Sequence, residues 1–317
     1  MEIAGRKVLV TGGAGFVGSN VCERLLQEGA EVVAYDNLSS GSMKNVEALS
    51  SNKGFKFVKG DVLDFQLLDN TIKENGIDTV VHLAANPDIR KGLAQTDLDL
   101  NQGPVATRNV LEAMRKNDVE TIMFSSSSAV YGIASVKPTP ENYGPLRPIS
   151  LYGASKLASE GLITAFSHVF GMHYYIFRFA NVVGKGYSHG VIFDFVNKLR
   201  KNSKELEVLG NGKQKKSYTD VDDIVSAMLY VYSKNLSDEI FNIANDDRLT
   251  VSEIASIVAA KMNLSPNIKY TGTEEGWPGD IADTWLSNEK LKKAGFACKL
   301  NSGQAVGKTI DLLLAKE

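Results

Sequence analysis

Short apolar runs and longer amphipathic segments alternate along the first half of the chain. Short runs of three to five residues that are rich in apolar side chains predict buried strands, and their regular alternation with helices predicts βαβ units and a parallel sheet. The runs lie at 8–10, 31–35, 56–59 and 79–83. Helices are expected at 19–29, 66–75, about 98–116 and from Leu151 onward. One further strand is expected at 121–124.

The alternation changes in the second half. Residues 137–148 carry four of the eight prolines, which predicts a stiff, extended loop. After a predicted strand at 173–177 the pattern becomes irregular, as expected where the chain covers a substrate. The alternation of strand and helix returns at 218–248, a segment that includes a strand-like run at 239–243. A helix at 250–262 with Thr250 as its cap, a segment at 286–294 and a final helix complete the prediction.

A glycine-rich turn follows the first predicted strand. Gly13, Gly15 and Gly18 match the G-x-G-x-x-G spacing, which permits a tight turn and brings backbone N–H groups and a helix N-terminus to a pyrophosphate. Asp36 ends the second run near the ~20-residue offset at which an acidic side chain binds the adenosine ribose. Its charge would repel a 2′-phosphate and no Arg lies between Asp36 and Lys44, so NAD is favoured over NADP.

Together these patterns predict an α/β fold, a Rossmann-type doubly wound parallel sheet with a smaller C-terminal substrate-binding domain. We expect residues 1–178 to form the NAD-binding domain, to which the chain returns around 218–248. Residues 179–317 then form mainly the substrate domain.

Composition narrows the class of protein. The 317 residues carry 35 Lys+Arg against 37 Asp+Glu, which argues against nucleic acid or an anionic membrane as the main partner. Cys22 and Cys298 are too few and too far apart for a disulfide framework or a thiolate metal site. No apolar run approaches ~18 residues and no signal segment precedes the first strand, so we expect a cytoplasmic protein.

Candidate chemistry lies at Tyr152 and Lys156, one turn apart on one face of a predicted helix. A cation beside a phenol favours the phenolate, so we expect Lys156 to lower the pKa of Tyr152 from its usual value near ~10. Tyr230 and Lys234 have the same spacing, but no serine-bearing strand end or small-residue loop accompanies them. The four-residue spacing of tyrosine and lysine therefore indicates a catalytic pair only together with the neighbouring serine and small-residue loop.

Ser127 follows the strand at 121–124, at the carboxyl edge where doubly wound sheets bind ligands. The small residues of the loop at 82–86 leave room for a flat cofactor. Serine, tyrosine and lysine at such a place suit hydride chemistry, because the hydroxyls can hydrogen-bond a substrate oxygen and the tyrosine can exchange its proton. We therefore expect Ser127, Tyr152 and Lys156 to be catalytic.

The histidines predict no metal site. His82, His168, His173 and His189 lack a zinc-type pairing. We interpret His168 and His173 as structural and His189 as a residue that faces substrate.

Several motifs occur together along nearly the whole chain. They are TGGAGFVG at 11–18, DNLSSG at 36–41, GDV at 60–62, HLAA at 82–85, Asn101, SSSAVYG at 126–132, YGASK at 152–156 and RFAN at 178–181. In this combination the sequence resembles the extended short-chain dehydrogenase/reductase (NAD-dependent epimerase/dehydratase) superfamily, and within it the UDP-glucose 4-epimerases, especially those of archaeal type.

The resemblance implies a set of NAD-binding residues, which includes the catalytic tyrosine and lysine. These are Gly12, Gly15, Phe16, Val17, Gly18, Asp36, Asn37, Leu38, Ser39, Ser40, Gly41, Asp61, Val62, Leu83, Ala84, Ala85, Asn101, Tyr152 and Lys156. It also implies a homodimer that packs helices near 101–116 and 152–168.

The resemblance further implies residues that bind the UDP-sugar. These are Ser127, Tyr152, Asn181, His189, Val191, Leu209, Lys216 and Asp280. Many family members have arginine at the positions of Lys216 and Trp277, and archaeal-type epimerases resemble this sequence at both. Lysine can meet a phosphate only as a point charge, without the bidentate fork of arginine.

The two residues after Ser127 narrow the reaction. The 4,6-dehydratases of the superfamily have an Asp–Glu pair there, whereas this chain has Ser128 and Ala129, so oxidation and reduction at one carbon remain. We expect a UDP-glucose/UDP-galactose 4-epimerase with tightly bound NAD. Alternatives are a UDP-N-acetylglucosamine or UDP-glucuronate 4-epimerase, a reductase, or a non-catalytic NAD-binding regulator; the modest size of Thr284 hints that an N-acetyl group is tolerated.

Overall fold

The computed structural model describes residues 2–272 and 279–315, so Trp277 lies outside the described residues. The chain forms two compact units. Unit 1 comprises residues 1–130, 150–178 and 228–241, and unit 2 comprises 131–149, 179–227 and 242–317.

A seven-stranded sheet, ordered β11-β6-β5-β4-β1-β2-β3, is the centre of unit 1. The pairs β2–β3, β1–β2, β1–β4 and β4–β5 are parallel, and β1 and β2 are in register from Lys7 opposite Glu31 to Thr11 opposite Tyr35. The predicted Rossmann-type α/β fold is confirmed. The strands are β1 Lys7–Thr11, β2 Glu31–Asp36, β3 Phe55–Lys59, β4 Thr79–His82, β5 Thr121–Ser127, β6 His173–Phe179 and β11 Glu239–Ile243.

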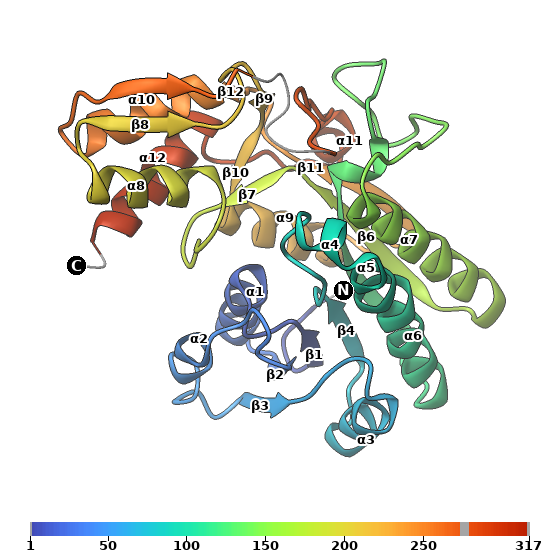
Figure 1. The fold of residues 1–317 in the computed structure, drawn as a ribbon. Coiled ribbons are helices and arrows are strands. Elements are labelled where there is room, and N and C mark those ends of the chain that lie inside the picture. Colours follow the sequence, from blue (N-terminus) through green and yellow to red (C-terminus); the bar gives the residue numbers. More distant parts are fainter. Residues whose placement is uncertain (1, 273–278, 316–317) are drawn as a thin grey trace. The chain divides into compact units, whose positions relative to one another are not determined.

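Helices cover both faces of this sheet. On one face α3, α6 and α7 lie in a row (Figure 1), and their apolar side chains share one buried cluster with Leu9, Val80 and Ile122 of the strands. Val8 and Val10 alternate with Leu9 and are also buried, on the face against which α1 packs. The helices of unit 1 are α1 Phe16–Gln27, α2 Met43–Glu47, α3 Phe65–Asn75, α4 Lys91–Ala94, α5 Thr96–Leu100, α6 Ala106–Lys116 and α7 Leu151–Phe170, and α9 Val221–Ser233 ends in it.

Two elements differ from the sequence prediction. The helix expected at 98–116 is divided into α5 and α6 by a π-helical turn at Asn101–Val105, which contains Pro104. Proline lacks an N–H and its ring crowds the preceding turn, and a wider turn accommodates this. Strand β5 runs on to Ser127 rather than ending at Phe124, because Ser125 and Ser126 are buried within the sheet.

Unit 2 is built from three short strand pairs and a helical layer. Helices α8, α10 and α12 pack on one another, and Thr250 forms the predicted cap of α10, in a capping box with Glu253. The strand pairs are β7 Asn181–Val183 with β10 Tyr218–Asp220, β8 Glu205–Val208 with β13 Asn267–Tyr270, and β9 Lys215–Lys216 with β12 Leu249–Thr250. The helices are α8 Val191–Lys201, α10 Val251–Lys261, α11 Glu289–Lys293 and α12 Ser302–Leu314.

The proline-rich loop at 131–149 groups with unit 2, whereas the sequence placed it within 1–178. Its contacts explain the difference. The Tyr131 hydroxyl donates to Asn242 Oδ1 at 2.8 Å, and the Thr139 amide donates to the Trp285 carbonyl at 2.7 Å. These partners are more than a hundred residues away along the chain, so no local pattern reports them.

Candidate active site

The glycine turn between β1 and α1 is packed too closely for side chains. Gly12 has φ +70°, and a Cβ on it would lie 2.9 Å from the Ala84 backbone nitrogen. A Cβ on Gly18 would lie 2.0 Å from the Gly12 carbonyl oxygen. Gly15 is the N-cap of α1 and has no side chain, so no side-chain hydrogen bond occupies the backbone amides of the first helical turn. This is the surface that a pyrophosphate needs.

Asp36 is anchored beside this turn. Its Oδ2 accepts from the Ala14 amide at 3.0 Å and its Oδ1 from the Leu38 amide at 2.7 Å. Asn37 donates from Nδ2 to Asp61 Oδ2 at 2.8 Å, which ties the end of β2 to the loop after β3. A Cβ on Gly41 would lie 2.9 Å from Asp36 Oδ1, so glycine allows the loop to close over the carboxylate.

The predicted NAD-binding residues all belong to unit 1. The bare glycine turn and the anchored carboxylate of Asp36 fit a dinucleotide, whose pyrophosphate would lie at α1 and whose adenosine ribose would lie at Asp36. Asn101 lies in the π-helical turn, half-buried, and donates to Asp97 Oδ2 at 3.5 Å. The loop after β4, with Leu83 to Ala85, is held by Thr11, whose Oγ1 accepts from the Leu83 and Ala84 amides.

We expect Asp36→Asn to raise the Kd for NAD about tenfold, since a charge-assisted hydrogen bond to the ribose contributes about 1.5–3 kcal/mol and the amide keeps part of it. Loss of the negative charge also removes the repulsion of a 2′-phosphate, so the preference for NAD over NADP falls. Isothermal titration calorimetry with both nucleotides measures this. Asp64→Asn, which keeps a good N-cap for α3, is the matched control and leaves both affinities unchanged; equal losses in both variants would contradict the assignment.

Ser127, Tyr152 and Lys156 come together at the carboxyl end of β5. Ser150 caps α7 through a hydrogen bond from the Gly153 amide at 3.1 Å, which places Tyr152 in the first turn and Lys156 in the second. The Tyr152 and Ser127 side chains are hydrogen-bonded. The Lys156 ammonium donates to the Ser125 carbonyl at 2.7 Å and lies 5.9 Å from the centroid of the Tyr152 ring.

The electrostatics of this cluster correct one expectation. Burial raises the pKa of Tyr152 to about 12; the hydrogen bond with Ser127 opposes the shift, and the charge of Asp99 adds to it. Lys156 therefore does not lower the phenol pKa below its usual value, because removing the phenolate from water outweighs a nearby cation. Burial likewise lowers the pKa of Lys156 to about 8, against the opposing charges of Glu160 and Asp99.

A buried ion pair supports the cluster from behind. Arg178 donates to both carboxylate oxygens of Glu160, at 2.9 and 2.7 Å, and these side chains are 3% and 5% exposed. Ser126 donates to Glu160 Oε1 at 2.5 Å. This pair holds α7 against β5 and β6. Glu160 was not predicted from the sequence, although an acidic residue four positions after Lys156 on a buried helix face was a signal for it.

His82 belongs to a second buried chain. Thr11 Oγ1 lies 2.7 Å from His82 Nδ1, Nε2 lies 3.2 Å from Thr107 Oγ1, and Thr107 donates to Ser159 at 3.0 Å. Since Thr107 gives its proton to Ser159, His82 must donate from Nε2 and accept at Nδ1. Burial lowers the pKa of His82 to about 3, so it is neutral. No cluster of three or more metal-ligating side chains occurs among residues 2–272 and 279–315.

The predicted substrate residues beyond Ser127 and Tyr152 all lie in unit 2. Lys216 and Asp280 form an ion pair with a 2.5 Å separation, and Asn181 donates to the Ser217 carbonyl at 3.0 Å. The His189 ring stacks on Tyr187 at a centroid distance of 6.1 Å, just before Val191 begins α8. Leu209 is 45% exposed. Asp280 thus meets the charge of Lys216, a contact that the sequence did not predict.

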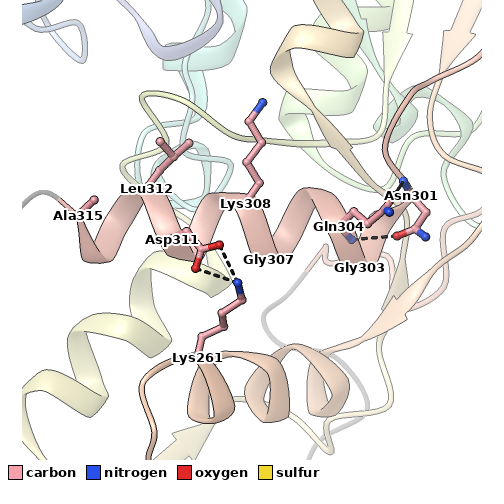
Figure 2. A pocket seen from close by; sticks show the side chains of 9 residues that line it. All are labelled: Lys261, Asn301, Gly303, Gln304, Gly307, Lys308, Asp311, Leu312 and Ala315. Carbon is pink, nitrogen blue, oxygen red and sulfur yellow. Dashed lines mark hydrogen bonds and ion pairs between the residues drawn. The ribbon is translucent and has the colours of Figure 1, made fainter.

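A separate pocket of about 750 Å³ lies along α12 in unit 2 (Figure 2). Lys261 and Asp311 face each other in it with Nζ–carboxylate distances of 2.6 and 2.8 Å, so their charges neutralise one another. No predicted site residue lines this pocket.

Comparison with known proteins identifies the family. The model of the NAD dependent epimerase/dehydratase family matches residues 8–244. The chain belongs to this family. The match covers the glycine turn, Asp36 and the Ser127–Tyr152–Lys156 cluster, and NAD is the cofactor.

Several relatives match this chain over almost its full length. A Methanocaldococcus jannaschii protein that carries the name of a UDP-glucose 4-epimerase is 31% identical over 96% of this chain and 97% of its own. A crystal structure of a UDP-galactose 4-epimerase is 39% identical, with a TM-score of 0.88 over 98% of this chain and 99% of that one. A Thermus thermophilus UDP-glucose 4-epimerase, solved with NAD, is 29% identical with a TM-score of 0.88 over 98% and 100%.

Further relatives are named as UDP-glucuronate and UDP-N-acetylglucosamine 4-epimerases and as dTDP-glucose 4,6-dehydratases. The comparisons support a nucleotide-sugar 4-epimerase and do not single out one sugar. Within the described part of the family member, no helix has the length and apolar character to cross a membrane.

Proposed function

We propose that this protein is a UDP-glucose/UDP-galactose 4-epimerase that inverts C4 through a transient 4-keto sugar. The observation that carries the proposal is the cluster of Ser127, Tyr152 and Lys156 at the carboxyl end of β5, with Ser128 and Ala129 next in the chain. This cluster has the hydroxyls for proton exchange at one carbon and lacks an adjacent acid–base pair for eliminating water.

Each residue has a distinct task. Tyr152 takes the proton of the C4 hydroxyl, directly or through Ser127, and returns it when the opposite face of the keto sugar is reduced. The chemistry that bound NAD supplies is reversible acceptance of the C4 hydride. Because burial raises the Tyr152 pKa, the phenol must first release its own proton to solvent before it can take the C4 proton, and the resulting phenolate would be favoured by the positive nicotinamide of bound NAD. Lys156 would stabilise that phenolate and hold the nicotinamide ribose.

In the proposed substrate region, Asn181, His189, Val191, Leu209, Lys216 and Asp280 bind the UDP portion. Lys216 forms an ion pair with Asp280, so its ammonium group can act as a point charge for a phosphate only where the phosphate takes the place of that carboxylate. We also propose a homodimer, formed through α6 and α7, and a cytoplasmic location.

A second candidate is epimerisation of UDP-N-acetylhexosamines. Thr284 favours it, since its side chain is small and its amide donates to the carbonyl of Lys215, the neighbour of Lys216 in the chain, at 3.1 Å. A UDP-N-acetylglucosamine 4-epimerase from Methanobrevibacter ruminantium also matches 99% of the chain.

The deciding experiment incubates the purified protein, first without and then with added NAD, with UDP-galactose, UDP-N-acetylgalactosamine and UDP-galacturonate. We expect UDP-galactose to be converted to UDP-glucose with no net formation of NADH, as resolved by chromatography of the sugars. Faster conversion of another sugar would replace the substrate assignment. Binding of NAD with no conversion of any sugar would instead indicate a non-catalytic regulator.

A further inference from the structure

The segment after β2 is hydrogen-bonded back onto the glycine turn. We call residues 37–45, which run from the end of β2 into α2, the strap. The carbonyl of Ala14, in the middle of the glycine turn, accepts from the Ser42 amide at 3.0 Å and from Asn45 Nδ2 at 2.8 Å. The Ala14 amide donates to Asp36 Oδ2 at 3.0 Å. Both backbone groups of this buried residue are therefore bonded to the two ends of one segment, at Asp36 and at Ser42 with Asn45.

The strap lies directly against the turn. A Cβ on Gly41 would lie 2.9 Å from the Ala14 Cβ and 2.9 Å from Asp36 Oδ1, so a side chain at this position would force the strap and the turn apart. On its inner side α2 is anchored by Val46, which is 4% exposed. The far end of the strap is thus fixed by the side-chain hydrogen bond of Asn45 and by one buried apolar residue.

The middle of the strap has a conformation that must be held in place. Leu38 has φ +63°, in the left-handed region where the Cβ of a leucine crowds the following carbonyl. Its amide donates to Asp36 Oδ1 at 2.7 Å, which holds the strap at its beginning. Backbone strain of this kind persists only where the surrounding structure over-determines it, and it is common at ligand clamps. The hydrogen bonds to Ala14 supply this constraint at the other end.

We propose that Asn45 is a positioning residue for NAD, which holds the strap against the glycine turn and so keeps the adenosine end of the cofactor in place. Residues 36–41 are among those expected to bind NAD, whereas Asn45 lies beyond them and acts through its hydrogen bond to Ala14. The proposal rests on the placement of the adenosine ribose at Asp36. It does not depend on the identity of the sugar.

The test is Asn45→Leu, because leucine has the branched shape of asparagine but cannot donate to the Ala14 carbonyl. Dissociation of the dinucleotide is followed by stopped flow, as the loss of NADH fluorescence when excess NAD displaces bound NADH. We expect the dissociation rate to rise about three- to tenfold, as for the loss of one hydrogen bond. The KM for added NAD should rise by a similar factor while kcat at saturating NAD is retained. A general disruption of unit 1 would lower kcat as well.

Asn75→Leu is the matched control. Asn75 is also half-buried in unit 1, and its Nδ2 donates to the Thr71 carbonyl at 2.7 Å at the end of α3. This variant loses the same kind of hydrogen bond away from the strap, so it should release NADH at the wild-type rate. An unchanged rate in Asn45→Leu, or an equal rise in both variants, would overturn the proposal.

A second variant reaches the same contact from the strap. Gly41→Ala adds the Cβ that would lie 2.9 Å from the Ala14 Cβ, so it should also speed the release of NADH. If Asn45→Leu does not fold, this variant decides the question, and a wild-type rate in it contradicts the proposal.

The Asp36→Asn measurement separates the proposal from its premise. Weaker NAD binding in Asp36→Asn with an unmoved rate in Asn45→Leu refutes the role of Asn45 alone. Unchanged binding in both variants refutes the placement of the ribose and the role of Asn45 together. A protein that shows faster release in Asn45→Leu but converts no sugar refutes the proposed function alone.

Discussion

Tyr152→Phe is expected to reduce kcat for UDP-galactose epimerisation by about 10²–10⁴-fold, the usual contribution of a positioned acid–base group. The substitution removes the hydroxyl that is hydrogen-bonded to Ser127 and leaves the ring and its contact with Lys156, 5.9 Å from the ring centroid. NAD binding should therefore be retained. Turnover is measured by a coupled assay, and bound NAD is measured by release after denaturation.

The chain supplies its own control for this variant. Tyr230 is followed by Lys234 at the same spacing, and the Lys234 ammonium lies 5.4 Å from the Tyr230 ring centroid, close to the geometry of the Tyr152 pair. No step of the proposed chemistry involves Tyr230, so Tyr230→Phe should keep full activity. Full activity of Tyr152→Phe, or an equal loss in both variants, would remove Tyr152 from the catalytic role.

Glu160→Leu is expected to lower the free energy of unfolding by about 3–5 kcal/mol, the usual cost of leaving one partner of a buried ion pair uncompensated. Arg178 would lose both of its hydrogen bonds to the carboxylate, and Ser126 would lose its acceptor. Lys156 would also lose a neighbouring negative charge. Urea denaturation followed by circular dichroism measures the change.

An exposed pair is the matched control for the stability measurement. Arg115 donates to both oxygens of Glu112, at 2.9 and 2.7 Å, in the same bidentate geometry as the buried pair but on the surface of α6. Glu112→Leu should leave the denaturation midpoint almost unchanged, because solvent screens exposed pairs. A midpoint for Glu160→Leu that matches the control would show that the buried pair contributes little.

Local patterns carried most of the fold prediction. Strands of unit 1 were found because buried parallel strands are continuous apolar runs, and the strand, glycine turn and helix at 8–29 are adjacent in the sequence. The catalytic hydroxyl and lysine were found for the same reason, since Tyr152 and Lys156 are one helical turn apart. Each of these features depends on residues within a few positions of one another.

Long-range contacts explain one difference between the sequence prediction and the structure. The grouping of 131–149 with unit 2 follows from contacts of Tyr131 and Thr139 with residues after 240. The interruption of the predicted helix at 98–116 shows a different limit, because apolar periodicity continues through a π-helical turn and Pro104 alone signalled the break.

The sequence by itself determined the α/β alternation, the glycine turn with Asp36, and the residue types available for proton and hydride chemistry. The tertiary structure decided their electrostatic state. It buried Tyr152 and so raised its pKa, and it paired Arg178 with Glu160. Composition and spacing show which chemical groups share one face of a helix or strand. The free-energy cost of a charge on such a group depends on the water and the partners around it, and elements distant in the chain provide these.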